Sequence, residues 1–277
     1  MKKIVTSHFL LVIILLCQFA MSGIIYGLNL DLPMAVSIVL SQLTIILPFM
    51  IYCIIKKENP FKVIRLKKIK FSTALLAVGI AVFSYPVVVL LNMVSMIFVE
   101  NAMIKVMPDV LAMGLIPGLL LMAFLPAMVE ETIFRGMVYN TYSKRRPIIG
   151  ILLSALLFGL MHMNFNQIMY AVYLGVIFAL VVEATGSLAS TMVLHMLFNA
   201  INTAYVYILP KLYEFLGQYS SEYANVDVEE MMNATVSKQD ILPSLLMMTP
   251  MAFVGLVLTI LLIRQIAKVN GREFSWK

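Results

Sequence analysis

Residues 119–135 read LLLMAFLPAMVEETIFR, an apolar run that carries Glu130, Glu131 and Arg135 at its end. The surrounding chain is equally apolar, since 62% of its 277 residues are hydrophobic and only 12% are charged. A typical soluble domain has a charged fraction of about 25%. This composition excludes a soluble globular enzyme, a disordered chain and a nucleic-acid-binding module. It predicts an all-α fold, a polytopic transmembrane helical bundle.

The apolar segments set the expected number of spans. A helix needs about 20 apolar residues to cross a bilayer, and about eight segments of the chain qualify. They lie at 8–28, 33–55, 72–98, 109–128 with a continuation to about 143, 147–163, 166–185, 188–209 and 243–264. The fourth is too long for one span, so we predict a break at Pro117-Gly118, then a long helix over 119–143. Pro126 should kink that helix near its start.

The basic residues set the expected orientation. Most of the 20 Lys and Arg residues lie in the N-terminus, the 56–70 loop, the 144–146 turn and the C-terminal tail. If the chain crosses the membrane eight times, all of these segments lie on the same side of the membrane. Because basic loops face the cytoplasm, we expect both termini there. Acidic residues are concentrated in the 210–242 loop, which we expect to be extracytoplasmic. The pattern favours a multi-pass protein of the bacterial plasma membrane over one of the endoplasmic reticulum.

Charged residues at bilayer depth are costly, so each is a candidate functional residue. Glu131 and Arg135 are four residues apart, which places them on one helix face and predicts an intrahelical ion pair. Glu130 is rotated from Glu131 by about 100° and should face something else. This segment alone leaves two readings open. Glu130 is either a general base or a spare carboxyl group that fixes helix packing.

Two histidines lie in the following spans. Phe158-x-x-x-His162 ends the fifth expected span, and His195-x-x-x-Asn199 lies in the seventh, where both side chains share one face. Along their helices, Glu130 is about 21 Å from Lys144 and His162 is about 24 Å from Arg146. The 144–146 turn joins those two helices, so the carboxylate and the imidazole should lie at similar depth. A lone histidine on an apolar helix is more often a packing residue, but three polar elements at compatible depth favour a common site.

The three motifs Glu130-Glu131-x-x-x-Arg135, Phe158-x-x-x-His162 and His195-x-x-x-Asn199 resemble those of the CPBP family of intramembrane proteases. This family is also called the CAAX protease and bacteriocin-processing, or Abi, family. The resemblance covers about 119–205, which we expect to be the catalytic core of a single membrane domain over 1–277. Residues 1–100 lie outside the resemblance, and we expect them to form accessory membrane helices. The resemblance implies an intramembrane endopeptidase that cleaves membrane-associated, prenylated or hydrophobic peptides, with lipid as its surroundings and no nucleic acid partner.

The resemblance also implies roles for the site residues. Glu130 would activate the attacking water with help from His162. His195 and Asn199 would stabilise the oxyanion. Glu131 and Arg135 would support the site and could contact substrate.

Members of the family are described both as metalloproteases and as metal-free enzymes. Zinc could be held by His162, His195 and either Glu130 or Glu131. The chain lacks the His-Glu-x-x-His helix that would indicate zinc strongly, so we expect a glutamate-activated water and commit to no cofactor. Two other classes stay open. A non-catalytic membrane scaffold could share this fold, and a transporter could use the same polar groups for protons, although the chain shows no internal repeat.

Overall fold

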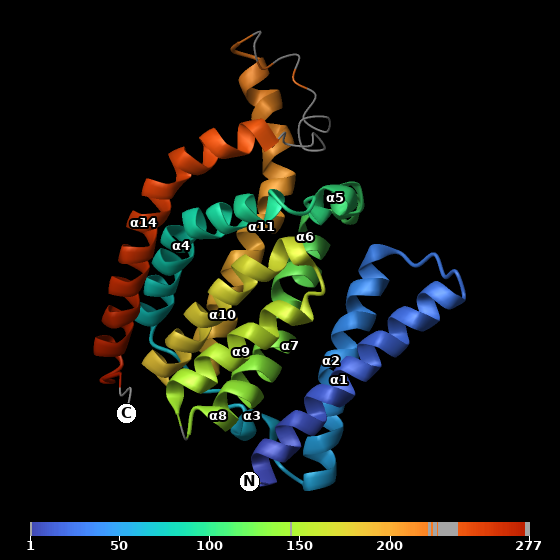
Figure 1. Cartoon of the computed structure of the whole chain (residues 1–277), viewed down its shortest axis with the longest axis vertical. Helices are drawn as coiled ribbons and strands as arrows, with labels where there is room; N and C mark the ends of the chain where they lie inside the picture. Colours follow the sequence, from blue (N-terminus) through green and yellow to red (C-terminus); the bar gives the residue numbers. More distant parts are fainter. Residues whose placement is uncertain (1, 145, 221–222, 224–225, 227–237, 275–277) are drawn as a thin grey trace.

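The computed structural model describes all residues except 1, 145, 221–222, 224–225, 227–237 and 275–277. The described chain is built from helices (Figure 1). The long ones are α1 (Lys2–Gly27), α2 (Met34–Lys56), α4 (Phe71–Met96), α10 (Phe165–Thr185), α11 (Leu188–Gly217) and α14 (Lys238–Val269). Shorter ones are α3 (Pro60–Val63), α5 (Ala102–Met113) and α9 (Pro147–Met161). Between α5 and α9 runs a helix made of α6 (Leu115–Gly118), η1 (Leu119–Phe124), α7 (Leu125–Glu131), η2 (Thr132–Tyr139) and α8 (Asn140–Tyr142).

Seven described helices are long and apolar enough to cross a membrane, which confirms a multi-pass all-α architecture. The expected span at 147–163 is helical, but α9 has only 15 residues and ends at Met161. It is about 22 Å long, shorter than the bilayer core of about 30 Å. Helix α9 ends there because Met163 is in the left-handed region at φ 48° and Asn164 caps the next helix by accepting from the N–H of Asn166. The chain therefore turns directly after His162.

The break before the long central helix lies at Gly114, three residues earlier than expected. Gly114 has φ +80°, which favours glycine, and the helix then runs from Leu115 to Tyr142. Pro117 falls in the first turn, where its missing N–H would have no helical partner in any case. Gly118 serves close packing, since a Cβ there would lie 2.8 Å from Oη of Tyr207. Near Pro126 the chain adopts the wider π-helical segment η1.

Several helices pack as pairs. Helix α4 packs along α14, α9 along α10, and α1 with α2 forms a hairpin at one side of the bundle (Figure 1). Helices α9 and α10 approach closely because Gly175 leaves its Cβ position empty; a Cβ there would lie 2.7 Å from Cα of Ala155. This contact fixes the position of the end of α9, and with it His162.

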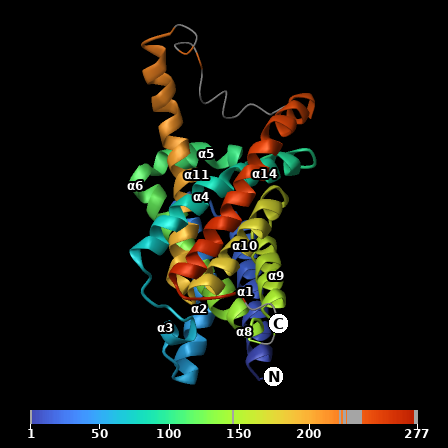
Figure 2. The same ribbon diagram turned by 90° about the vertical axis from the view of Figure 1, so that its left-hand side faces the viewer.

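The basic segments of the chain lie together at one end of the bundle. The start of α1, the segment with α3, the turn after α8 and the end of α14 all lie at the lower end in Figure 1, and Figure 2 shows the same arrangement. These are the basic segments of the sequence, so the structure gathers them at one end. Helix α11 reaches the other end and continues to Gly217, two turns beyond its expected boundary. Part of the expected acidic loop at 210–242, namely 221–222, 224–225 and 227–237, lies outside the described residues.

Candidate active site

Glu131 and Arg135 form the predicted ion pair. The guanidinium Nη1 of Arg135 donates to Oε1 of Glu131 over 2.8 Å, and both side chains are fully buried. Glu131 ends α7 and Arg135 lies in η2, the second π-helical segment. Segments of this kind are frequent at functional sites. A buried pair of this type fixes geometry because neither charge has water to replace its partner.

Two aromatic rings enclose the guanidinium of Arg135. Its Cζ lies 4.3 Å from the ring centroid of Phe158 and 5.1 Å from that of Phe178. Nε and Nη2 of Arg135 have no hydrogen-bond acceptor among the described residues, so these rings are their main surroundings. The attraction between the cation and the ring faces offsets part of the missing hydrogen bonding. Phe158 of the second motif therefore holds the arginine of the first.

His195 of α11 connects the two carboxylates. Its Nδ1 lies 3.1 Å from Oε1 of Glu131, the oxygen that also accepts from Arg135. Its Nε2 lies 3.9 Å from Oε2 of Glu130. The imidazole is 3% exposed and stacks on Phe178, with centroids 5.0 Å apart. Since Glu131 can only accept here, Nδ1 of His195 carries a hydrogen.

Glu130 has a different environment from Glu131. Its side chain is 15% exposed, whereas that of Glu131 is fully buried. Its Oε1 accepts a hydrogen bond of 3.2 Å from Nε2 of Gln42 on α2. The two carboxylates thus have separate partners, as their rotation on the helix predicts, although His195 faces both. Gln42 was missed from sequence; an amide within an apolar span was the only signal for it.

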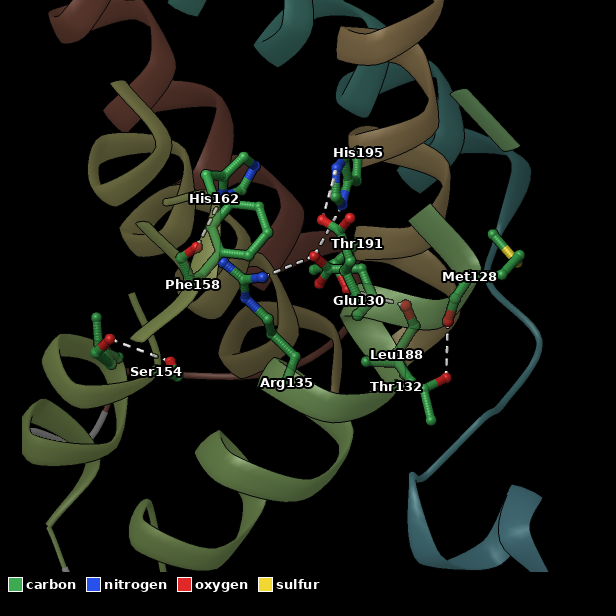
Figure 3. Close-up of polar contacts among 12 residues, drawn as sticks. Met128, Glu130, Thr132, Arg135, Ser154, Phe158, His162, Leu188, Thr191 and His195 are labelled. Atoms are coloured by element: carbon green, nitrogen blue, oxygen red, sulfur yellow. Dashed lines mark hydrogen bonds and ion pairs between the residues drawn. The ribbon is translucent and has the colours of Figure 1, made fainter. Parts of the chain in front are cut away.

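His162 and His195 both lie against the ring of Phe158 (Figure 3). The rings of both histidines meet that of Phe158 edge to face, with centroids 4.9 Å apart for His162 and 5.6 Å for His195. Nδ1 of His162 lies 2.8 Å from the backbone oxygen of Phe158, so it donates there, and in the neutral imidazole Nε2 is then an acceptor. The structure thus brings His162 next to the cluster without a direct bond to either glutamate.

Asn199 follows His195 by one turn of α11 and is half-buried. Its amide forms no hydrogen bond with the part of the chain that the structure describes. Glu183, another charged residue of the apolar segments, lies apart from this cluster; it accepts from the hydroxyl of Tyr139. His8 contacts Tyr142 at the basic end. The candidate site is therefore made of Glu130, Glu131, Arg135, Phe158, His162, His195 and Asn199, together with Gln42.

The side chains as placed do not fit the zinc site considered above. A catalytic zinc ion has three protein ligands, and the expected set was His162, His195 and one glutamate. Within the described ranges, no three His, Cys, Asp or Glu side chains are grouped so that they could hold a metal ion. Oε1 of Glu131 is engaged by Arg135 and His195. No reaction step is therefore assigned to a metal.

The paired glutamates, His195 and Arg135 thus meet between the helices of the bundle, with Phe158 and His162 beside them. Residues 112–201 match the family model "Type II CAAX prenyl endopeptidase Rce1-like". The matched segment contains all three motifs, which confirms the resemblance to the CAAX prenyl endopeptidase family inferred from them. Neither the curated proteins nor the solved structures compared with the chain gave a match.

Proposed function

We propose that this protein hydrolyses peptide bonds of membrane-associated, prenylated or otherwise hydrophobic peptides by a water that Glu130 activates. The observation that carries the proposal is the difference between the two carboxylates. Glu131 is fully buried and held by Arg135 and His195, whereas Glu130 is 15% exposed and can meet water. The match of residues 112–201 to the prenyl endopeptidase family supports the same chemistry.

In the proposed reaction, Oε2 of Glu130 accepts one proton of the water as its oxygen bonds to the scissile carbonyl carbon. In the neutral imidazole of His162, Nε2 is the acceptor nitrogen when Nδ1 donates to Phe158, and in that form it can accept a hydrogen bond from the same water. The proton held by Glu130 then passes to the amide nitrogen as the carbon–nitrogen bond breaks. The products are a carboxylic acid and an amine, which become a carboxylate and an ammonium group by exchange of one proton, and Glu130 returns to its starting state.

The oxyanion formed in the first step needs hydrogen-bond donors. Asn199 supplies an amide N–H₂ group that is not engaged by any described residue. His195 already donates from Nδ1 to Glu131, so it can also donate from Nε2 only as an imidazolium. In that form it would have a counter-charge on Glu131 at 3.1 Å, because Glu130 has by then accepted the proton of the water. Arg135 and Glu131 orient this donor and contact no reacting atom.

The proposed setting is a bacterial plasma membrane, with the basic end of the bundle and both termini in the cytoplasm. The gathering of the basic segments at one end supports this orientation under the positive-inside rule. In this setting the protein is one membrane domain over 1–277. The catalytic core is 119–205, and helices of 1–100 are accessory. The intact set of polar groups favours an enzyme over a scaffold of the same fold.

The proposal can be tested with purified protein in liposomes. Two probe peptides share one sequence that ends in a CAAX motif, and only one of them carries a farnesyl group on its cysteine. Mass spectrometry would follow cleavage by the wild type and by Glu130→Gln. We expect the wild type alone to release the last three residues. Cleavage by Glu130→Gln at the wild-type rate would overturn the role of Glu130. Equal cleavage of both peptides by the wild type would show that the prenyl group is not required for substrate recognition.

A further inference from the structure

Gln42 comes from a part of the chain that the family match does not include. It lies in the middle of α2, whereas the match covers 112–201. Its side chain is buried, at 8% exposure, and its Nε2 lies 3.2 Å from Oε1 of Glu130. Helix α2 packs against α7, the helix that carries Glu130, so this contact belongs to a packed interface.

The chemistry of the contact fixes its direction. A carboxylate can only accept, so the amide of Gln42 presents its N–H₂ group to Glu130. Oε1 of Gln42 then has no hydrogen-bond donor among the described residues. A buried amide that is only half satisfied destabilises a fold. The one described group that this amide serves is the carboxylate of Glu130, so folding alone gives little reason for a glutamine at this position.

The contact also determines which oxygen of Glu130 is left for chemistry. With Oε1 bound to Gln42, Oε2 points toward Nε2 of His195, 3.9 Å away. That separation is too long for a direct hydrogen bond and allows one water to contact both atoms. A neutral donor restricts the carboxylate without adding a charge. A lysine in place of the glutamine would form an ion pair and weaken Glu130 as a base.

We propose that Gln42 is a positioning residue for the general base, so that the accessory hairpin of α1 and α2 completes the active site. This inference rests on the proposed function of Glu130. Gln42 binds one carboxylate oxygen and holds the other in the orientation that removes the proton from water. Loss of the amide donor therefore affects the chemical step more than the binding of substrate.

Gln42→Leu tests the inference, and Gln18→Leu is the matched control. Gln18 lies on α1 and donates from Nε2 to Ser41 of α2 at 3.3 Å, so its loss removes a glutamine contact of the same hairpin away from Glu130. With the farnesylated probe peptide in liposomes, we expect Gln42→Leu to lower kcat roughly 10- to 100-fold with KM changed less than about threefold. Gln18→Leu should keep the wild-type kcat.

An infrared measurement gives a readout that does not depend on turnover. The carboxylate band of Glu130 would be found from the difference spectrum of wild type and Glu130→Gln. It should shift in Gln42→Leu and stay in place in Gln18→Leu. If Gln42→Leu does not fold, Gln42→Met keeps an unbranched side chain of similar length and replaces it in both assays.

The outcomes separate this inference from the proposed function. Wild-type kcat and an unshifted Glu130 band in Gln42→Leu would overturn the role of Gln42 while Glu130→Gln stays inactive. An equal loss of kcat in Gln18→Leu would also overturn it, because the effect would then reflect loosened packing of the hairpin. Full activity of Glu130→Gln would instead overturn the proposed function, and the band shift would still report the contact.

Discussion

Nδ1 of His195 lies 3.1 Å from Oε1 of Glu131, although 64 residues separate them along the chain. The same oxygen accepts from Arg135, so one carboxylate joins the helix of the paired glutamates to α11. This contact fixes which nitrogen of the imidazole carries its hydrogen. It also directs the other nitrogen toward Glu130. A residue that touches no reacting atom can in this way set the orientation of a donor that does.

Arg135→Ala should lower the stability of the folded protein. The substitution leaves the fully buried carboxylate of Glu131 without its cation, and breaking such a pair costs about 3–5 kcal/mol. Thermal unfolding in detergent and the amount of protein in the membrane would measure the loss. The double variant Glu131→Leu/Arg135→Met should recover part of it, because no charge is then buried without a partner. Unchanged stability of Arg135→Ala would rule out the ion-pair role.

Substitutions of the two histidines should have different effects on stability. His195→Ala removes a donor to the buried Glu131 and should destabilise the protein by about 1–3 kcal/mol as well as lower cleavage. His162→Ala removes a half-buried ring whose one hydrogen bond among the described residues is to a backbone oxygen. It should therefore lower cleavage with little change in unfolding temperature. Equal destabilisation by the two variants would contradict this difference.

Asn199→Leu should act on catalysis alone. The amide of Asn199 is not bonded to any described residue, so its removal leaves no described group without a partner. Removing one oxyanion donor typically lowers kcat by about 10²- to 10³-fold. Steady-state kinetics in liposomes would show whether KM stays near its wild-type value. A higher KM with unchanged kcat would indicate that Asn199 binds substrate and does not stabilise the oxyanion.

Gly175→Ala should separate α10 from α9. A Cβ at this position would lie 2.7 Å from Cα of Ala155, and this backbone atom can move only if the helices move apart. We expect a loss of stability of about 1–3 kcal/mol and lower activity, since α9 carries His162. Gly23→Ala is the matched control, because nothing lies within 4 Å of a Cβ there. If the two variants unfold at the same temperature, the close approach has no structural role.

Local spacing was enough to predict part of the site from sequence. The four-residue separation of Glu131 and Arg135 gave their ion pair. That Glu130 and His162 lie at similar depth stays a prediction. Contacts between distant helices could not be obtained in this way. The bond from His195 to Glu131 depends on how α11 packs, and that from Gln42 to Glu130 depends on α2. Neither of these contacts between helices can be predicted from the spacing of residues within a single segment.

The boundaries of the helices were less predictable than their existence. Pro117 and Gly118 suggested a break, but proline is tolerated in a first helical turn and this glycine makes room for Tyr207. The end of α9 could not be predicted from the sequence because Met161, His162 and Met163 have no strong tendency to end a helix. It is instead set by the left-handed backbone of Met163 and by the capping side chain of Asn164.

The central claim is that peptide-bond cleavage in the membrane depends on Glu130. The most direct test is a comparison of all peptide termini in membranes from cells that express the wild type or Glu130→Gln at equal levels. We predict termini that appear only with the wild type and that identify its substrates. Identical sets of termini under several growth conditions would contradict the account and favour a non-catalytic scaffold.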